Sequence, residues 1–427
     1  MTEKGKEVSV YDRLGGNVEE EIKGYPIEDL KLLTTERDGR PTVSRCVENV
    51  YRIIDRHPSF AGRFRHDKWT QKNEIKDEKG WRELDDSDFV PIQRIISSMY
   101  PQFRNVPKEM TIDAIHDVCN EHSYDSAVDY LRGLPEWDGL DRLGIWIHQV
   151  YGASDDYKYH GAVGSNFFKG MVARILHPGC KFDSVLILEG MQGTFKSTSL
   201  SIIARDWHLE TAMRAENKDF FLQFKGKLIV EFSEGETLSR TETKSMKAMI
   251  STRTDTYRTP YGRTMKDVPR RCVFAMTTNQ EEYLKDESGN RRFYPVEVKQ
   301  VADVAWLHEN RDQLFAEALY RVEVLKETLH EYPDSAKEHQ SRKLVSNQHE
   351  ERIAEWLNHP SRCTAIERDG ITVDEIWMNA LMGDIVRMTK RDQMQIGAVL
   401  KKLGFEKERV QINGVQSMRW YLKGVQV

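Results

Sequence analysis

The chain has 427 residues, which at about 150 residues per domain predicts two or three domains. Hydrophobic residues make up 39% of it, enough for a core, and no stretch approaches the roughly 18 uninterrupted apolar residues of a membrane helix. The formal net charge of -5 excludes a globally basic nucleic-acid-binding protein, although 63 Lys and Arg residues leave room for local basic patches. We therefore expect a globular protein without a membrane partner.

The N-terminal residues and the cysteines indicate the compartment. Neither an apolar run nor an Arg-rich segment follows Met1, so we expect no secretory signal and no transit peptide. The five cysteines are odd in number and contain no C-x-x-C pair, which argues against a disulfide framework or a structural zinc site. We therefore expect reduced thiols and a cytoplasmic protein.

The N-terminal third of the chain is predicted to form a leader and an accessory domain. Residues 1–40 are polar and acidic, and we expect them to be loosely ordered. Residues 41–140 mix helical patterns, such as 44–56, with short strand-like pieces around 64–69, which predicts an α+β domain. Turn-forming residues cluster at 134–141, and we place the domain boundary there.

The next predicted domain, residues 141–330, has the pattern of an α/β fold. Five stretches are expected as strands: 184–188, 207–211, 227–230, 272–276 and 294–298. Helical patterns lie between them, and this alternation predicts a parallel sheet with right-handed crossovers. A charged linker, residues 331–349, then leads to a small terminal unit, residues 350–427.

A glycine-rich segment directly follows the first of these strands and opens a helix. Residues 189–198 read EGMQGTFKST, close to the Walker A phosphate loop. In such a loop the backbone amides surround the β-phosphate, Lys196 neutralises the β and γ oxygens, and Ser197 can bind Mg²⁺. The candidate ATP-binding residues are Gly190, Gly193, Thr194, Lys196, Ser197 and Thr198. Phe195 replaces the consensus glycine, so a tolerable β-carbon requires a negative φ here. An incidental glycine-rich turn is the alternative.

Three downstream features supply what a nucleotide hydrolase needs. Glu231 and Glu234 lie at the end of a predicted strand, where Glu231 can bind metal and the other carboxylate can polarise the attacking water. Asn279 follows the strand 272–276, at the edge where open α/β sheets bind ligands, and it can sense the γ-phosphate. Arg291 and Arg292 follow a tight turn, from which an arginine can reach a neighbouring subunit's nucleotide. Each feature has an ordinary structural alternative, but their order favours nucleotide hydrolysis.

In this order the motifs resemble the virulence-associated protein E (VapE) family of phage and mobile-element P-loop ATPases, which is similar to superfamily 3 helicases and viral primase-helicases. The resemblance covers about residues 118–329. It runs through Tyr130-Leu131, Trp137-Asp138-Gly139, Pro178 to Asp183, Glu189 to Gly193, Glu231 with Glu234, Asp255 to Gly262, Thr277 to Asn279 and Gly289 to Phe293. It implies a P-loop NTPase core with an AAA+ or superfamily 3-like parallel sheet, ATP and Mg²⁺ as cofactors, and a hexameric ring. It also implies catalytic roles for Lys196, Glu231, Glu234, Asn279, and Arg291 or Arg292.

A basic hairpin between the acidic strand and the Asn279 strand is the first candidate DNA contact. In helicases of this type such a hairpin projects into the ring channel, and basic side chains with an interleaved tyrosine suit a single-stranded backbone and its bases. The candidate residues are Arg258, Tyr261, Arg263 and Lys266. The alternative is a solvated loop that packs on the next subunit.

The terminal unit is the second candidate DNA contact. Residues 381–427 contain nine Lys or Arg and four acidic residues, a local charge of +5. Two predicted helices, 371–382 and 390–403, precede a hairpin whose turn is Asn413-Gly414. This order resembles a winged-helix unit, which binds either DNA or protein.

Together these features predict an ATP-dependent DNA motor, a superfamily 3-like helicase or translocase that acts on single-stranded or forked DNA in the replication of a phage or mobile genetic element. The alternative is a nucleotide-regulated replication initiator or assembly scaffold with weak or no ATP turnover. A small-molecule P-loop kinase is disfavoured, because the basic hairpin and terminal unit would then lack a purpose. Asp85, Asp86 and Asp88 are expected on a solvated loop and form no primase site, so a primase would be a separate chain.

Overall fold

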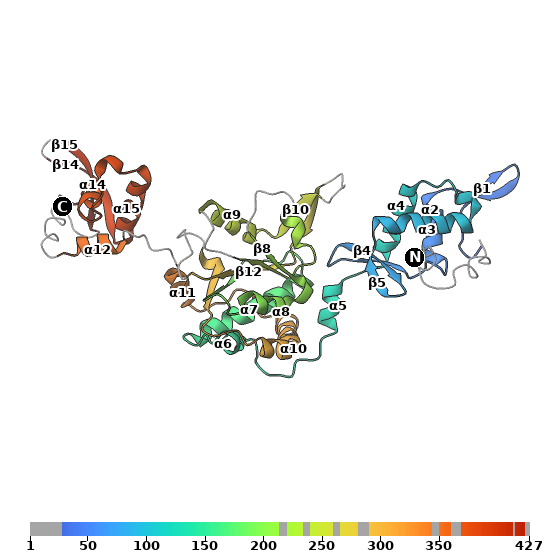
Figure 1. The fold of residues 1–427 in the computed structure, drawn as a ribbon, viewed down its shortest axis with the longest axis horizontal. Helices are drawn as coiled ribbons and strands as arrows, with labels where there is room; N and C mark the ends of the chain where they lie inside the picture. Colours follow the sequence, from blue (N-terminus) through green and yellow to red (C-terminus); the bar gives the residue numbers. More distant parts are fainter. Residues whose placement is uncertain are drawn as a thin grey trace, which may run out of the picture. The chain divides into compact units, whose positions relative to one another are not determined.

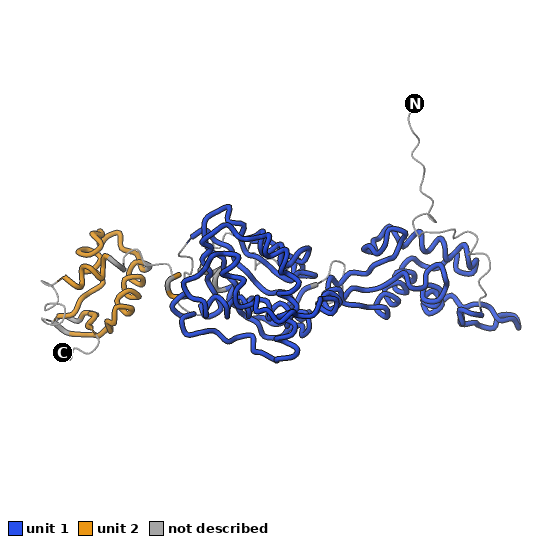
Figure 2. The backbone as a smooth tube through the Cα atoms, turned by 90° about the horizontal axis from the view of Figure 1, so that it is seen from below, with its two compact units in different colours: residues 1–281, 289–340 blue, residues 282–288, 341–427 orange. Residues whose placement is uncertain are grey.

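The computed structural model describes residues 28–212, 220–233, 240–258, 265–280, 290–343, 350–359, 369–412 and 415–422. The chain divides into two compact units, which Figure 2 colours separately. The larger unit comprises residues 1–281 and 289–340, and the smaller one comprises 282–288 and 341–427. The domain boundary that the sequence suggests near residue 140 stays a prediction.

The first part of the larger unit has the mixed α and β content predicted for residues 41–140. A four-stranded sheet has the order β5-β4-β3-β6, with β3 (Phe64–Asp67), β4 (Lys72–Asp77), β5 (Gly80–Glu83) and β6 (Ser123–Tyr124). The helices are α2 (Val47–Arg56), α3 (Asp86–Met99), α4 (Lys108–Glu121) and α5 (Ser126–Arg132) (Figure 1). A separate hairpin pairs β1 (Thr34–Arg37), within the predicted leader, with β2 (Arg40–Val43).

The acidic residues 85–88 begin a helix, so the predicted solvated loop is wrong. Asp85 is the N-cap of α3, and its side chain accepts a hydrogen bond from the amide of Ser87 at 2.7 Å. Asp88 is only 8% exposed and binds the Arg82 guanidinium at 2.5 and 2.7 Å. Clustered short acidic side chains suit a turn, but they equally suit the first turn of a helix, where they satisfy unpaired amides.

The centre of the larger unit is an α/β fold built on a five-stranded parallel sheet. Its order is β13-β7-β12-β9-β8, with β7 (Val185–Glu189), β8 (His208–Thr211), β9 (Ile229–Phe232), β12 (Val273–Thr278) and β13 (Phe293–Glu297). All five predicted strands and their parallel arrangement are confirmed, with ends that differ by one or two residues. Every residue of β7 and β12 is buried, as expected for strands covered on both faces.

Helices cover both faces of this sheet. They are α6 (Trp146–Tyr151), α7 (Tyr157–Leu176), α8 (Lys196–Ala204), α9 (Arg240–Ser251), α10 (Val304–Glu323) and α11 (Ala336–Arg342). In Figure 1, α6, α7, α8 and α10 gather on one side of the strands and α9 lies on the other. The predicted hairpin is present as antiparallel β10 (Thr254–Arg258) and β11 (Met265–Pro269), and its turn lies outside the described residues.

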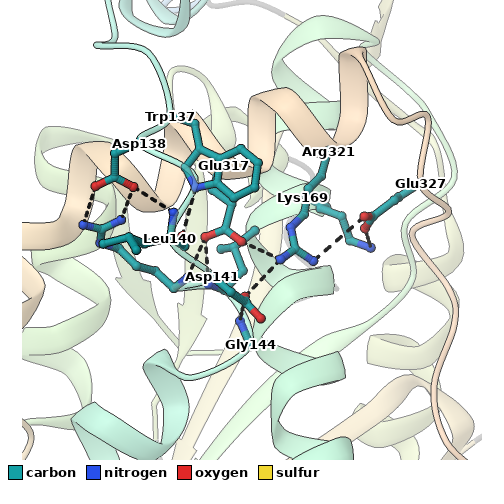
Figure 3. Close-up of polar contacts among 11 residues, drawn as sticks. Trp137, Asp138, Leu140, Asp141, Gly144, Lys169, Glu317, Arg321 and Glu327 are labelled. Carbon is teal, nitrogen blue, oxygen red and sulfur yellow. Dashed lines mark hydrogen bonds and ion pairs between the residues drawn. The ribbon is translucent and has the colours of Figure 1, made fainter.

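A polar network fixes the segment that precedes α6 onto α10 (Figure 3). The fully buried carboxylate of Glu317 accepts hydrogen bonds from the backbone amides of Arg142 at 2.8 Å and Leu143 at 3.0 Å. It also accepts one from the guanidinium of Arg321 at 2.5 Å. Burial raises the pKa of Glu317 against the effect of these donors. Nearby, Asp138 pairs with Arg142 at 2.7 Å and the Trp137 indole donates to a main-chain carbonyl at 2.9 Å. These contacts support a structural role for the Trp137-Asp138 motif.

The smaller unit contains the two helices and the hairpin that the sequence predicts. Its elements are α12 (Glu350–Leu357), α14 (Val373–Asn379), α15 (Lys390–Lys402), β14 (Phe405–Ile412) and β15 (Val415–Leu422). Ile376, Ile396, Leu400 and Trp420 form its apolar centre. The Asn413-Gly414 turn lies outside the described residues, and DNA or protein binding by this unit stays a prediction.

The structure also shows the state of the described cysteines and the character of the described helices. Cys46, Cys119, Cys180 and Cys272 are free thiols, and Cys363 lies outside the described residues. Among the helices of the described part, none combines the length and apolar character needed to cross a membrane.

Candidate functional site

The glycine-rich segment forms a tight loop between β7 and α8. Gly190 has a φ of +152°, and a β-carbon placed there would lie 2.8 Å from the carbonyl oxygen of Val298. Both the backbone and the space therefore require glycine at this position. Gly193 has a φ of +83°, and Thr194 tightens the loop by donating its hydroxyl to the Met191 carbonyl at 2.9 Å. The loop thus has the compact, backbone-lined form that its sequence predicts.

Phe195 adopts a backbone conformation that contradicts the sequence-based expectation. Its φ is +58° and its ψ is 32°, in the left-handed region, at the N-cap position of α8. The loop demands this conformation immediately before the helix, whichever side chain is present, which explains the glycine of the consensus. A β-carbon in this region costs roughly 1 to 2 kcal/mol. Phe195 is 49% exposed, so its bulk is accommodated at the surface.

Substitution at Phe195 tests this conformation. Phe195→Gly is expected to be about 1 kcal/mol more stable than Phe195→Ala, because only the alanine variant keeps a β-carbon at positive φ. Urea unfolding of the two variants measures the difference. Ser201, exposed within α8, provides the control: there the alanine variant is expected to be the more stable by roughly 0.5 to 1 kcal/mol. If the alanine variant is the more stable one at position 195 as well as at position 201, residue 195 is not in the left-handed region.

Lys196 occupies the first position of α8 and its side chain runs back across the loop. The ammonium donates to the carbonyls of Gly190 at 2.6 Å and Met191 at 2.8 Å. It also donates to Oδ1 of Asn279 at 3.1 Å, which joins the loop to the end of β12. Lys196 is 8% exposed, so its positive charge is concentrated inside the loop. The predicted loop lysine and the predicted sensor amide are therefore neighbours.

Glu231 is fully buried in β9 and lies at the centre of a hydrogen-bond cluster. Its Oε1 accepts from the hydroxyl of Ser197 at 2.5 Å and from that of Thr277 at 2.7 Å. Its Oε2 lies 2.9 Å from Nε2 of His208. Burial raises the pKa of Glu231, but the hydrogen bonds from His208, Ser197 and Thr277 outweigh it and hold the pKa below its ordinary value. The carboxylate is therefore ionised at neutral pH.

The strand order explains why these residues meet. Since β12 lies between β7 and β9, the loop after β7, the end of β12 and the carboxylate in β9 share one edge of the sheet. The sequence motifs predict Lys196, Ser197, Glu231 and Asn279 as site residues, but not Thr277 or His208. Thr277 stands two residues before Asn279 and so points to the same side of the strand, a signal that could have been read. His208 gave no such signal, because only the pairing of β8 with β9 brings it near.

The other predicted site residues are not part of this cluster. Thr198 is exposed on α8, and Lys266 is exposed on β11. Arg291 is exposed in the short turn before β13, whereas Arg292 is 19% exposed and pairs with Asp183 at 3.4 Å. Glu234, Tyr261 and Arg263 lie outside the described residues, as does the side chain of Arg258.

Sequence comparison relates this fold and site to a known family. The model of the virulence-associated protein E-like domain matches residues 131–352, just over half of the chain, including the sheet and the loop. The chain belongs to this family. The match confirms the resemblance that the motifs suggest, and the VapE-like region contains all four clustered candidates, Lys196, Ser197, Glu231 and Asn279.

Solved structures with detectable similarity to the VapE-like chain include two apo structures of the NrS-1 C terminal region. One, of residues 305–718 of that protein, is 15% identical with a TM-score of 0.48 and covers 84% of this chain and 96% of that one. The other, an A form apo structure, is also 15% identical with a TM-score of 0.49 and the same coverage. No curated protein matches the VapE-like chain in sequence.

Proposed function

We propose that this VapE-like protein binds ATP with Mg²⁺ and hydrolyses it. The observation that carries the proposal is the convergence of a loop lysine, a helix-opening serine, a buried carboxylate and a strand-end amide at one edge of a parallel sheet. In phosphoryl transfer the lysine would bind phosphate, the serine would hold the metal, the carboxylate would activate water and the amide would sense the γ-phosphate. The loop then corresponds to a Walker A motif and the domain to a P-loop NTPase core.

Lys196 is suited to bind the β and γ phosphates. Among its acceptors in the described residues are two neutral carbonyls and one amide oxygen, which are weaker acceptors than a phosphate oxygen. A bound triphosphate would offer anionic oxygens to Lys196 at this loop. The backbone amides at the start of α8 would donate to the same phosphates. The hydrogen bonds of Lys196 across the loop therefore hold its charge where the proposed triphosphate would bind.

Ser197 and Glu231 fit a magnesium ion. Their oxygens lie 2.5 Å apart, and a hydroxyl and a carboxylate are the hard ligands that Mg²⁺ takes in proteins. Because hydrogen bonds keep Glu231 ionised, the pair offers a negative charge at neutral pH. When bound, Mg²⁺ neutralises charge on the β and γ phosphate oxygens. Glu231 or Glu234 then polarises the attacking water, and Asn279 orients the γ-phosphate.

The arginine pair supplies the candidate for action between subunits. Arg291 is exposed, while Arg292 is held by Asp183. We therefore assign to Arg291 the role of stabilising phosphoryl transfer on a neighbouring subunit's nucleotide within a hexameric ring.

The wider function that we propose is an ATP-dependent DNA motor, a helicase or translocase in phage or mobile-element replication. It rests on membership of the VapE-like family and on the basic hairpin β10–β11, from which Lys266 projects into solvent. The C-terminal unit, as a winged helix, would contact DNA or a separate primase. The second candidate is a replication scaffold in which ATP binding drives assembly without turnover, since Phe195 strains the loop.

Steady-state ATP hydrolysis, with and without single-stranded and forked DNA, tests the motor proposal. DNA is expected to raise the rate several-fold, and Lys266→Glu to reduce that stimulation by placing a negative charge beside the DNA backbone. Lys158→Glu, an equal charge reversal at an exposed residue of α7, provides the control and should keep the stimulation. Nucleotide binding without turnover would favour the scaffold. Turnover without any DNA response would contradict the motor and revive a kinase.

A further inference from the structure

His208 makes a contact with Glu231 that the proposed reaction does not by itself require. It opens β8, the edge strand of the sheet, and its backbone pairs with Ile229 of β9. Glu231 lies two residues further along β9 and so points to the same side of the sheet as Ile229. The imidazole Nε2 lies 2.9 Å from Glu231 Oε2, and the His208 side chain is only 12% exposed. The contact therefore joins a fully buried carboxylate to a mostly covered imidazole on the neighbouring strand.

The backbone at His208 is held firmly. The carbonyl of the preceding residue, Trp207, accepts a hydrogen bond from the amide of Leu228 at 2.8 Å. The Trp207 ring packs against Trp69 at 5.2 Å and against Tyr130 at 5.6 Å between ring centroids. Because these aromatic contacts fix the start of β8, the imidazole reaches Glu231 from a defined position.

A carboxylate held at only one oxygen would not have a defined orientation. The terminal torsion of a glutamate side chain is broad, so hydrogen bonds to Oε1 alone would leave the plane of the Glu231 carboxylate free to rotate. The hydrogen bond from His208 to Oε2 fixes this plane while Oε1 accepts from Ser197 and Thr277. It also favours the ionised carboxylate in a buried setting.

We propose that His208 is a positioning residue that orients the Glu231 carboxylate toward Ser197 and the magnesium ion they would share. The inference rests on the proposed ATP hydrolysis and deepens it, because it assigns a role to a residue on a strand that carries no nucleotide motif. Hydrogen-bonding partners of metal ligands have effects of this kind: their loss typically lowers metal affinity or activity by roughly 10- to 100-fold.

The test uses the full chain with His208→Ala and His208→Gln. Alanine removes the donor, and kcat for ATP hydrolysis is expected to fall at least about 10-fold while KM for ATP changes less than about twofold, since Lys196 is untouched. The Mg²⁺ concentration that supports half-maximal binding of a fluorescent ATP analogue is expected to rise. Glutamine can place an amide N–H near the Nε2 position and is expected to restore most of kcat and of the Mg²⁺ response.

His122→Ala provides the matched control, because His122 pairs with Asp55 at 3.0 Å, far along the chain from the nucleotide loop. It should leave both readouts unchanged. If the alanine variant keeps wild-type kcat and Mg²⁺ dependence, the proposal is overturned. It is equally overturned if the glutamine variant, folded by thermal melting, is as defective as the alanine variant. Wild-type protein without ATP turnover would refute the proposed hydrolysis instead, and Mg²⁺-dependent analogue binding would then decide the role of His208.

Discussion

Replacing Lys196 with alanine is expected to lower steady-state ATP hydrolysis by roughly 100- to 1,000-fold, as is typical when one preorganised donor to a reacting oxyanion is removed. The ammonium is buried in the loop and bonded to Gly190, Met191 and Asn279, so its positive charge lies at the proposed phosphate site. ATP affinity is expected to fall as well, since the same charge binds the ground-state triphosphate.

Loss of activity through unfolding must be separated from loss of the charge. Lys169 provides the comparison: it is 6% exposed and its ammonium bonds the Glu327 carboxylate at 3.0 Å and a main-chain carbonyl at 2.9 Å, outside the loop. Lys169→Ala should lower the melting temperature to a similar extent yet keep ATP turnover. Turnover by Lys196→Ala within about tenfold of wild type would refute the assignment of the loop.

Replacing Glu231 with glutamine is expected to reduce hydrolysis by roughly 100-fold or more while ATP still binds. The amide oxygen can still accept from Ser197 and Thr277, and the His208 ring can change tautomer to accept from the amide nitrogen. The fold is therefore kept, and the negative charge for metal and water is lost. Filter binding or a fluorescent ATP analogue measures the retained affinity beside the turnover rate.

Glu210 offers a closely matched control for this substitution. It stands directly opposite Glu231 in the β8–β9 register but is exposed. Glu210→Gln removes the same charge from the neighbouring strand and should change turnover by less than about twofold. Wild-type turnover by Glu231→Gln would remove this carboxylate from the reaction and leave Glu234 as the candidate.

The strands and the loop were predictable because their signals are local. The run from Val185 to Leu188 is apolar without a break, as buried parallel strands are, and the glycine loop follows it directly. Lys196 and Ser197 could be chosen from the loop motif, and Glu231 and Asn279 from their positions at predicted strand ends. The family resemblance, drawn from the same motifs, is confirmed by the match over residues 131–352.

What the sequence failed to predict depends on contacts between distant segments. His208 joins Glu231 only because β8 happens to be the neighbour of β9, and no local pattern states which strands pair. The positive φ of Phe195 is imposed by the closure of the loop rather than by the preference of phenylalanine. Asp85 was misread because a helix cap and a turn use the same short polar side chains.

Trp69 belongs by sequence to the accessory region, yet its ring is 2% exposed within the apolar cluster that otherwise comprises residues between 127 and 336. The Arg271 guanidinium lies over it at 4.7 Å and pairs with Asp125 at 2.7 Å. Two segments that differ in character along the chain thus share one core. Loss of the Trp69 ring would leave a cavity beside Trp207, at a cost of about 3 to 5 kcal/mol, so each of the two segments depends on the other for its stability.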